Sequence, residues 1–327
     1  MSEQPDDRTA TPGGRWAGGP RRLLALLVIA VVAVGLVVAN LVTRGDDSSQ
    51  PIARGDAQRI TGEPLEYLAL GDSLSRGVQP GGAGNQVTDE GYPRQLAARL
   101  RSRQRVALIE AGCGAATTSS MIDGGRCAPD APVPYLNQGR STSQLTWAIR
   151  HVRDRTDRPT LVTLDIGGND LQRCVSPDVA RLRRCLTALR PAIERRWRRI
   201  ARGLSAVAGP QTVLAVSTTY DPFVALVRTG TAVRPAVRAM HRFVTGTLNP
   251  RMARIFRREG WLIADLARAM RAGDRLGGPS SRPVRAICDL TWMCARADIH
   301  LNADGYALAA RSFDRATRRS LAALDVR

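Results

Sequence analysis

The feature that most constrains the fold is an alternation of short apolar runs with longer stretches of helical periodicity. Five apolar runs read as strands, at residues 66–70, 105–111, 160–166, 212–218 and 261–266. Helical stretches at 92–103, 143–154 and about 178–208 separate the first four runs, and a final helix is expected from Asp304 to about Leu324. Strands that alternate with helices form βαβ units. We therefore expect an α/β fold in one domain, with a central five-stranded parallel sheet covered on both faces.

The stretch from about 178 to 208 carries the clearest helical signal. Pro191 is expected to kink this helix, and Gly209-Pro210 to end it. Its apolar residues recur at spacings of three and four and so form one stripe. The stripe consists of Leu182, Leu186, Leu189, Ile193, Trp197, Ile200 and Leu204.

The N-terminal region predicts a membrane anchor. Residues 23–42 carry no formal charge, and a helix of that length spans roughly 30 Å, the thickness of a bilayer core. Arginines precede this run and two aspartates follow it, so the positive-inside rule places residues 1–22 in the cytoplasm. We expect a polar linker over 43–61 and one folded domain over 62–327, held outside the cell by a single-pass membrane helix.

The alternative for the N-terminus is a cleaved signal peptide, which would release the domain as a secreted protein. Such a peptide has an apolar region of about 7–15 residues and a small-x-small cleavage site. The apolar run here is longer, and "VVANLVTRG" offers only a poor cleavage site. An uncleaved anchor is therefore the preferred interpretation.

The formal net charge of +19 first suggests a nucleic-acid partner. All 48 basic residues are arginine, however, and they are spread through every expected helix instead of forming one tail. An Ala-rich, lysine-free composition is typical of codon usage in a GC-rich genome. Export past a membrane and an aromatic content of 4% also argue against a nucleic-acid module. If the positive charge has a specific partner, we expect anionic lipid or an envelope polymer.

Six cysteines follow the apolar run, and none of them forms a C-x-x-C pair, so a zinc ribbon or a thioredoxin-like motif is not indicated. An even count in an exported domain suggests disulfides. Six cysteines permit fifteen pairings, and pairing between sequence neighbours closes three short loops. We predict Cys113–Cys127, Cys174–Cys185 and Cys288–Cys294; the alternative is that some of these residues are small buried hydrophobes.

The stretch "EYLALGDSLSRG", residues 66–77, ends an apolar run with Gly, Asp and Ser. A simple turn would explain it, and so would a serine held at the carboxyl end of a strand, where parallel sheets gather their chemistry. Serine becomes a nucleophile only beside a base, usually histidine. His151 and His241 lie in helical stretches and are expected to be surface or half-buried residues. His300 lies in the polar loop "ADIHLNADGY" and is the candidate base.

An attacking serine also needs donors for the oxyanion that forms on the carbonyl. In "LDIGGNDL" the third strand ends at Gly167-Gly168, which lets the backbone turn and present the Asn169 amide. This pattern alone is a common turn. After a strand, and in a chain that also holds "GDSL" and a late loop histidine, it indicates an oxyanion hole.

The ordered set of "GDSL", "GGND" and "DIH" resembles the SGNH/GDSL family of serine esterases and lipases, over residues 65–325. The cysteine spacing and "ICDLTWMC" look like the secreted actinobacterial branch of that family. The resemblance implies a flavodoxin-like three-layer α/β/α fold and hydrolysis of carboxylic esters without a cofactor. It also implies that Ser73 is the nucleophile, that His300 is the base, and that Asn169 and the Ser73 N–H belong to the oxyanion hole.

The sequence departs from the family pattern at two places. In "CGAATT" the glycine expected in the oxyanion hole is replaced by Ala115, with Gly114 just before it, and a site that needs a positive φ would favour Gly114. The usual D-x-x-H spacing would put the acid at Ala297, whereas Asp298 lies two residues before His300. Either Asp298 or a backbone carbonyl could orient the imidazole. Asp72 and Asp170 are expected to be hydrogen-bonding turn residues.

Competing motifs are weak. The chain has no G-x-S-x-G elbow and no H-E-x-x-H or other metal spacing, and "PGGAGN" at 80–85 lacks the lysine and helix of a phosphate loop.

We expect a monomeric extracytoplasmic serine hydrolase that cleaves carboxylic esters through an acyl-enzyme, with no metal. The alternative is a non-catalytic envelope-binding domain on the same scaffold. Lipid, acylated glycan and small esters all stay open as substrates, because selectivity depends on the loops around 78–90, 119–140 and 221–233.

Overall fold

The computed structural model describes residues 63–125, 127, 133–135 and 143–324. The predicted tail over 1–22, anchor helix over 23–42 and linker over 43–61 lie outside the described residues. Within the described part, no helix is both long and apolar enough to cross a membrane.

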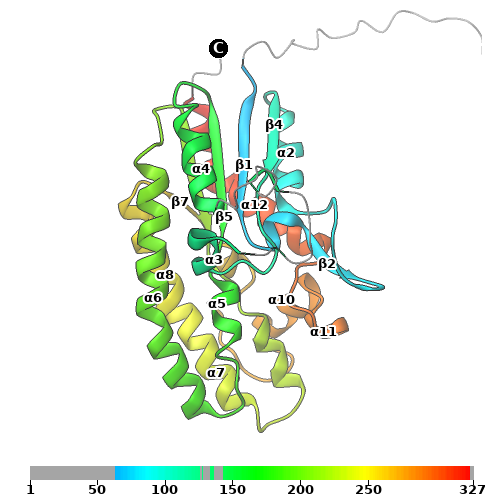
Figure 1. The fold of residues 1–327 in the computed structure, drawn as a ribbon. Helices are drawn as coiled ribbons and strands as arrows, with labels where there is room; N and C mark the ends of the chain where they lie inside the picture. The colour runs from blue at the N-terminus through cyan, green and yellow to red at the C-terminus, as the bar shows by residue number, and fades with distance from the viewer. Residues whose placement is uncertain (1–62, 126, 128–132, 136–142, 325–327) are drawn as a thin grey trace, which may run out of the picture. The chain divides into compact units, whose positions relative to one another are not determined.

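A five-stranded sheet forms the centre of the domain, as predicted (Figure 1). Its strands are β1 (Leu65–Gly71), β4 (Val106–Glu110), β5 (Thr160–Asp165), β6 (Thr212–Ser217) and β7 (Leu262–Ala264). They lie in the order β4-β1-β5-β6-β7, and every neighbouring pair is parallel. Numbered along the chain, this order is 2-1-3-4-5, the order of flavodoxin-like folds. The last strand is shorter than the predicted 261–266, because Asp265 already caps the next helix.

Helices cover both faces of the sheet, so the domain has three layers. The side chains of β1 are divided between two hydrophobic cores, one on each face of the sheet. Leu65, Tyr67 and Ala69 belong to the first core, and Leu68 and Leu70 belong to the second. The first core is closed by α2 (Tyr92–Arg101) and α12 (Ala303–Ala322). The second core is closed by α4 (Gln144–Arg153), α6 (Val179–Ser205) and α8 (Asn249–Arg258).

The predicted apolar stripe of α6 is buried along its full length. The helix begins after Asp178, whose carboxylate accepts hydrogen bonds from the Ala180 and Arg181 N–H groups. It continues through Pro191 as one helix and ends at Ser205, before the predicted Gly209-Pro210. The burial of the stripe holds this long helix on the sheet.

All three predicted disulfides are present, Cys113–Cys127, Cys174–Cys185 and Cys288–Cys294, and the described cysteines include no free thiol. The alternative that some of these residues are unpaired hydrophobes is wrong. The second disulfide ties the loop after a short helix to α6, and the third ties α10 (Arg282–Leu290) to α11 (Met293–Arg296).

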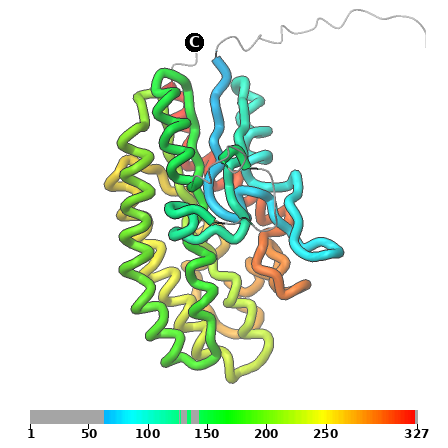
Figure 2. Tube along the Cα trace, in the orientation of Figure 1, coloured from blue at the N-terminus to red at the C-terminus, as the bar shows by residue number. Residues whose placement is uncertain are grey.

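The connections between the strands hold a hairpin and several short helices that periodicity did not reveal. The hairpin consists of β2 (Val78–Gly81) and β3 (Gly84–Val87). The short helices are η1 (Leu74–Arg76), α3 (Thr118–Asp123), α5 (Gly168–Gln172), η2 (Pro222–Arg228), α7 (Arg234–Phe243), η3 (Val244–Leu248), α9 (Leu266–Ala269), α10 (Arg282–Leu290) and α11 (Met293–Arg296). Figure 2 shows that the connection after β6 brings α7 beside α6. This connection forms a wall next to the carboxyl ends of the strands.

Candidate active site

The GDSL turn is a rigid exit from β1. Gly71 has a φ of 131°, and a Cβ at this position would lie 2.1 Å from the Asp165 carbonyl oxygen, so only glycine fits. The buried Gln144 side chain holds both backbone groups of Gly71. Its Oε1 accepts from the Gly71 N–H at 2.8 Å, and its Nε2 donates to the Gly71 carbonyl at 3.0 Å. Ser73 is therefore fixed at the carboxyl end of the strand; nothing in the sequence pattern had singled out Gln144.

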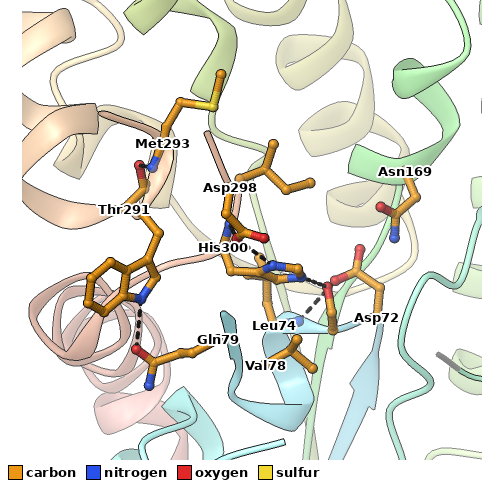
Figure 3. Close-up of polar contacts among 12 residues, drawn as sticks. Asp72, Leu74, Val78, Gln79, Asn169, Thr291, Met293, Asp298 and His300 are labelled. Carbon is orange, nitrogen blue, oxygen red and sulfur yellow. Dashed lines mark hydrogen bonds and ion pairs between the residues drawn. The ribbon is translucent and has the colours of Figure 1, made fainter. Parts of the chain in front are cut away.

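The structure brings Ser73, His300 and Asp298 together in one line of hydrogen bonds (Figure 3). The Ser73 Oγ lies 3.0 Å from His300 Nε2, and the Asp298 Oδ1 lies 2.7 Å from His300 Nδ1. With the ring proton on Nδ1, the imidazole donates to the carboxylate and its Nε2 accepts from the serine hydroxyl. This is the arrangement that a serine nucleophile needs.

The unusual spacing of the acid has a local explanation. The Asp298 Oδ1 also accepts a hydrogen bond from the His300 backbone N–H at 2.8 Å, so the two residues form an Asx turn. Ala297, where the family pattern would put the acid, ends α11 in a left-handed conformation with a φ of 52°. The carboxylate thus reaches the ring from a position one residue later, and no backbone carbonyl is needed to orient it.

The loop that carries His300 is anchored from several sides. Thr291 and Leu301 form an isolated antiparallel bridge, and the Trp292 N–H donates to the His300 carbonyl at 2.9 Å. The Trp292 indole N–H donates to Gln79 Oε1 at 2.9 Å, which ties the loop to the hairpin (Figure 3). The Tyr220 hydroxyl donates to the Ile299 carbonyl. These contacts hold the imidazole in place before any substrate arrives.

Asn169 has its side-chain amide oriented by two neighbours. Its Oδ1 accepts from Gln172 Nε2 at 2.7 Å, and its Nδ2 donates to the Ala116 carbonyl at 2.9 Å. A side-chain amide nitrogen has two hydrogens, so one N–H remains for a substrate oxygen. Figure 3 shows this nitrogen on the side of Asn169 that faces Asp72. Gln172 was not foreseen, although its spacing of three from Asn169 on a helix is the signal that could have revealed it.

The two candidates for the second block of the oxyanion hole, Gly114 and Ala115, lie in the loop whose Ala116 carbonyl accepts a hydrogen bond from Asn169 Nδ2. Ser73 and Asn169 line the hollow, whereas neither Ala115 nor Gly114 does. Ala115 is exposed and has a φ of 60°, a left-handed conformation that favours glycine, while Gly114 is buried. Among the described residues, no backbone carbonyl accepts a hydrogen bond from the Ser73 N–H or from the Ala115 N–H.

Two buried carboxyl residues, Asp72 and Asp165, line the hollow together with Ser73. The Asp72 Oδ1 accepts from the Leu74 N–H at 3.1 Å, so Asp72 is the hydrogen-bonding turn residue that was expected. Asp165 Oδ2 lies 3.3 Å from the Asp72 N, and Asp165 Oδ1 accepts from the Tyr92 hydroxyl at 2.9 Å. Burial, together with the charge of Asp72, raises the pKa of Asp165 well above its ordinary value, and burial also raises the pKa of Asp72.

Asp170 and the other two histidines lie outside this line of contacts. Asp170 accepts from the Thr118 N–H and hydroxyl at 2.8 and 2.7 Å, and so ties α3 to α5. His151 is half-buried, as expected, and its Nε2 lies 2.6 Å from Glu66 Oε1 at the opposite end of β1. The prediction for His241 is wrong: the residue is buried, because η2 packs against α7 and brings Asp221 Oδ2 to 3.4 Å from its Nδ1.

A hollow of about 660 Å³, its open mouth included, surrounds the serine. It is lined by Ser73 and His300, by Asn169 after β5, and by Thr218 and Thr219 after β6. Within the described residues, no group of three His, Cys, Asp or Glu side chains is placed to hold a metal ion. Because Ser73, His300 and Asn169 line one hollow, they can present a nucleophile, a base and an amide donor to the same bound carbonyl group.

The sequence matches the GDSL-like lipase/acylhydrolase family over residues 69–308, a span that includes Ser73, Asn169 and His300. The chain belongs to this family. Membership in the GDSL-like family supports an ester-cleaving hydrolase. No curated protein matches the sequence.

Several solved structures resemble this GDSL-like protein weakly. An extracellular lipase from Streptomyces rimosus is 18% identical, with 77% of this chain and 100% of that chain covered and a TM-score of 0.47. Phospholipase A1 from Streptomyces albidoflavus NA297 is 22% identical, with 65% and 86% covered and a TM-score of 0.40. Est24, a carbohydrate acetylesterase from Sinorhizobium meliloti, is 14% identical, with 78% and 99% covered and a TM-score of 0.41. The family assignment rests on the family match alone.

Proposed function

We propose that this GDSL-like protein is a serine esterase that hydrolyses carboxylic esters through an acyl-enzyme. The observation that carries the proposal is the line from Ser73 Oγ through the His300 ring to Asp298, at 3.0 and 2.7 Å, beside an open hollow. A serine in an ordinary solvated turn would need neither a buried histidine beside its hydroxyl nor a carboxylate hydrogen-bonded to that histidine.

The reaction has two halves. Ser73 Oγ attacks the ester carbonyl carbon while His300 Nε2 takes the hydroxyl proton, and the Asn169 N–H and the Ser73 N–H stabilise the oxyanion. The bond from carbon to the alkoxy oxygen then breaks, and His300 gives its proton to the leaving alcohol. A water molecule attacks the acyl-enzyme, again losing a proton to Nε2. When the bond between carbon and Oγ breaks, that proton returns to Ser73 and the free carboxylic acid leaves.

The proposed place of this reaction is outside the cell membrane, with residues 23–42 as the anchor. The apolar run and its arginine flank support the anchor, and three disulfides are typical of a protein in an oxidising compartment. We also propose that the protein belongs to a secreted actinobacterial branch of the family, which would agree with this location.

Replacement of the nucleophile tests the mechanism. Ser73→Ala is expected to lower kcat/KM for p-nitrophenyl butanoate by at least about 10³-fold, because no acyl-enzyme can form, while the melting temperature changes little. A fluorophosphonate probe should label Ser73 in the purified protein, and a form of the probe that cannot cross membranes should label it on intact cells. Unlabelled Ser73, or full activity in Ser73→Ala, would instead favour the non-catalytic envelope-binding domain.

A further inference from the structure

A second hollow adjoins the one that holds Ser73. Its volume is about 490 Å³, its open mouth included, and it lies between η2, α7, the start of α6 and the loop before α6. Every side chain that lines it is apolar except that of Ser176. Leu182, Leu226 and Val237 form much of the wall, and no charged residue contributes to it. We call this second hollow the apolar groove.

The apolar groove lies next to the catalytic hollow. Phe223 and Met240 line both, so an occupant that leaves Ser73 in this direction passes these two side chains and enters the groove. Figures 1 and 2 show α6 and α7 side by side along this stretch. Val175, at 43% exposure, is one of two large apolar side chains that are exposed among the described residues, and it lies in the same groove.

We propose that the apolar groove binds the acyl chain of the ester, so that the substrates are esters of medium-chain or long-chain fatty acids rather than acetyl esters. This inference rests on the proposed serine esterase function. Each buried methylene contributes about 0.8 kcal/mol, whereas an acetyl group attached to Ser73 would leave the groove in contact with water. A polar acyl group would find no side-chain hydrogen-bond partner there except Ser176.

The outer wall of the apolar groove is held in place before substrate binds. Val175, Ser176 and Pro177 follow Cys174 directly, and the Cys174–Cys185 disulfide ties their loop to α6. On the other side, the Asp221 carboxylate caps η2 by accepting from the Phe223 N–H at 3.0 Å. A preformed apolar groove loses little conformational entropy on binding a chain, which is the condition for chain-length selectivity.

A series of p-nitrophenyl esters tests the inference, because the leaving group is the same in acetate, butanoate, octanoate and decanoate. With the full-length chain, kcat/KM is expected to rise about fourfold per added methylene until the groove is full. Ala236→Phe puts a ring into the apolar groove, and the ratio of octanoate to acetate kcat/KM should fall about fifteenfold for every two methylenes that the ring displaces. Ala188→Phe, on the exposed face of α6, is the matched control and should keep the wild-type ratio.

Val175→Asp provides a second variant in case the buried Ala236→Phe protein does not fold, because the Val175 side chain is exposed and its replacement should not unfold the domain. It too should lower the octanoate-to-acetate ratio. A flat profile, with acetate hydrolysis that depends on Ser73, would overturn the acyl-chain inference and leave the esterase proposal intact. Equal ratios in Ala236→Phe and Ala188→Phe would do the same. The absence of Ser73-dependent hydrolysis of every ester would overturn both.

Discussion

At the scale of single residues, Asp298 shows how a departure from a family spacing can keep the same geometry. The side chain begins one residue closer to His300 than expected, and the Asx turn directs its Oδ1 back to the ring nitrogen. One carboxylate oxygen therefore orients both the backbone and the imidazole. The contact also selects the ring tautomer, which leaves Nε2 free to accept the Ser73 proton.

Removal of this carboxylate gives a direct test. Asp298→Ala is expected to lower kcat for p-nitrophenyl butanoate by about 10²-fold or more, because the ring loses its orientation and the imidazolium loses its counter-charge. Steady-state kinetics would measure this loss. Asp289→Ala, which removes an exposed carboxylate from the same region, serves as the control. Equal activity of the two variants would mean that Asp298 has no part in orienting His300.

The buried pair of Asp72 and Asp165 predicts a pH dependence of stability. Burial raises the pKa of Asp165 in the folded state, so between the ordinary carboxyl pKa and this raised value the folded chain binds more protons than the unfolded chain. The free energy of unfolding must then fall as pH rises through this window, by up to about 1.4 kcal/mol per pH unit for one proton.

Asp165→Asn should remove most of that fall, because the amide stays neutral, while its oxygen can still accept from the Asp72 N–H and its nitrogen can donate to the Tyr92 hydroxyl oxygen. Urea unfolding at a series of pH values from 4 to 8 would measure it. The variant is expected to show the smaller slope, with a remainder due to Asp72, whose pKa burial also raises. A slope as steep as that of the wild type would show that Asp165 does not hold the proton.

At the scale of elements, the short segments at the carboxyl ends of the strands do most to shape the site. η1 follows Ser73 directly, α5 begins with Gly168-Asn169, and η2 with α7 forms a wall of the apolar groove. Each segment is too short to be stable as an isolated helix, so each depends on packing against α6 or the sheet, or on a disulfide, for its position.

The Cys174–Cys185 disulfide is the clearest case of such support. Its sequence separation is 11 residues, and a loop of that size is expected to stabilise the fold by about 2–3 kcal/mol through the entropy of the unfolded chain. Cys174→Ser with Cys185→Ser should lower the free energy of unfolding by this amount in urea titrations. A loss below about 0.5 kcal/mol would mean that contacts other than the disulfide hold this loop.

At the scale of the whole molecule, the strand order brings distant parts of the chain to one edge. Ser73 follows β1, Asn169 follows β5, and His300 precedes α12, yet all three line the same hollow. In a parallel sheet the carboxyl ends of neighbouring strands meet at one edge, so the loops after β1, β5 and β6 open onto the same hollow. Among the described residues, no arginine lines this hollow, and we propose no nucleic-acid partner.

The sequence by itself determined the five strands, the stripe of α6, the three disulfides and the candidate residues Ser73, Asn169 and His300. These signals are local, because periodicity, cysteine spacing and turn chemistry act over a few neighbouring residues. Only the tertiary structure decided that Asp298 reaches the ring, that Gln144 locks Gly71, that Asp165 pairs with Asp72 and that His241 is buried. Apart from the contact of Asp298 with His300, which lie two positions apart, these contacts join residues far apart in the chain, 73 positions in the case of Gly71 and Gln144, and their distances depend on how whole layers pack. The position of the apolar groove next to the hollow at Ser73 arises from the same packing and has no signature in any short stretch of sequence.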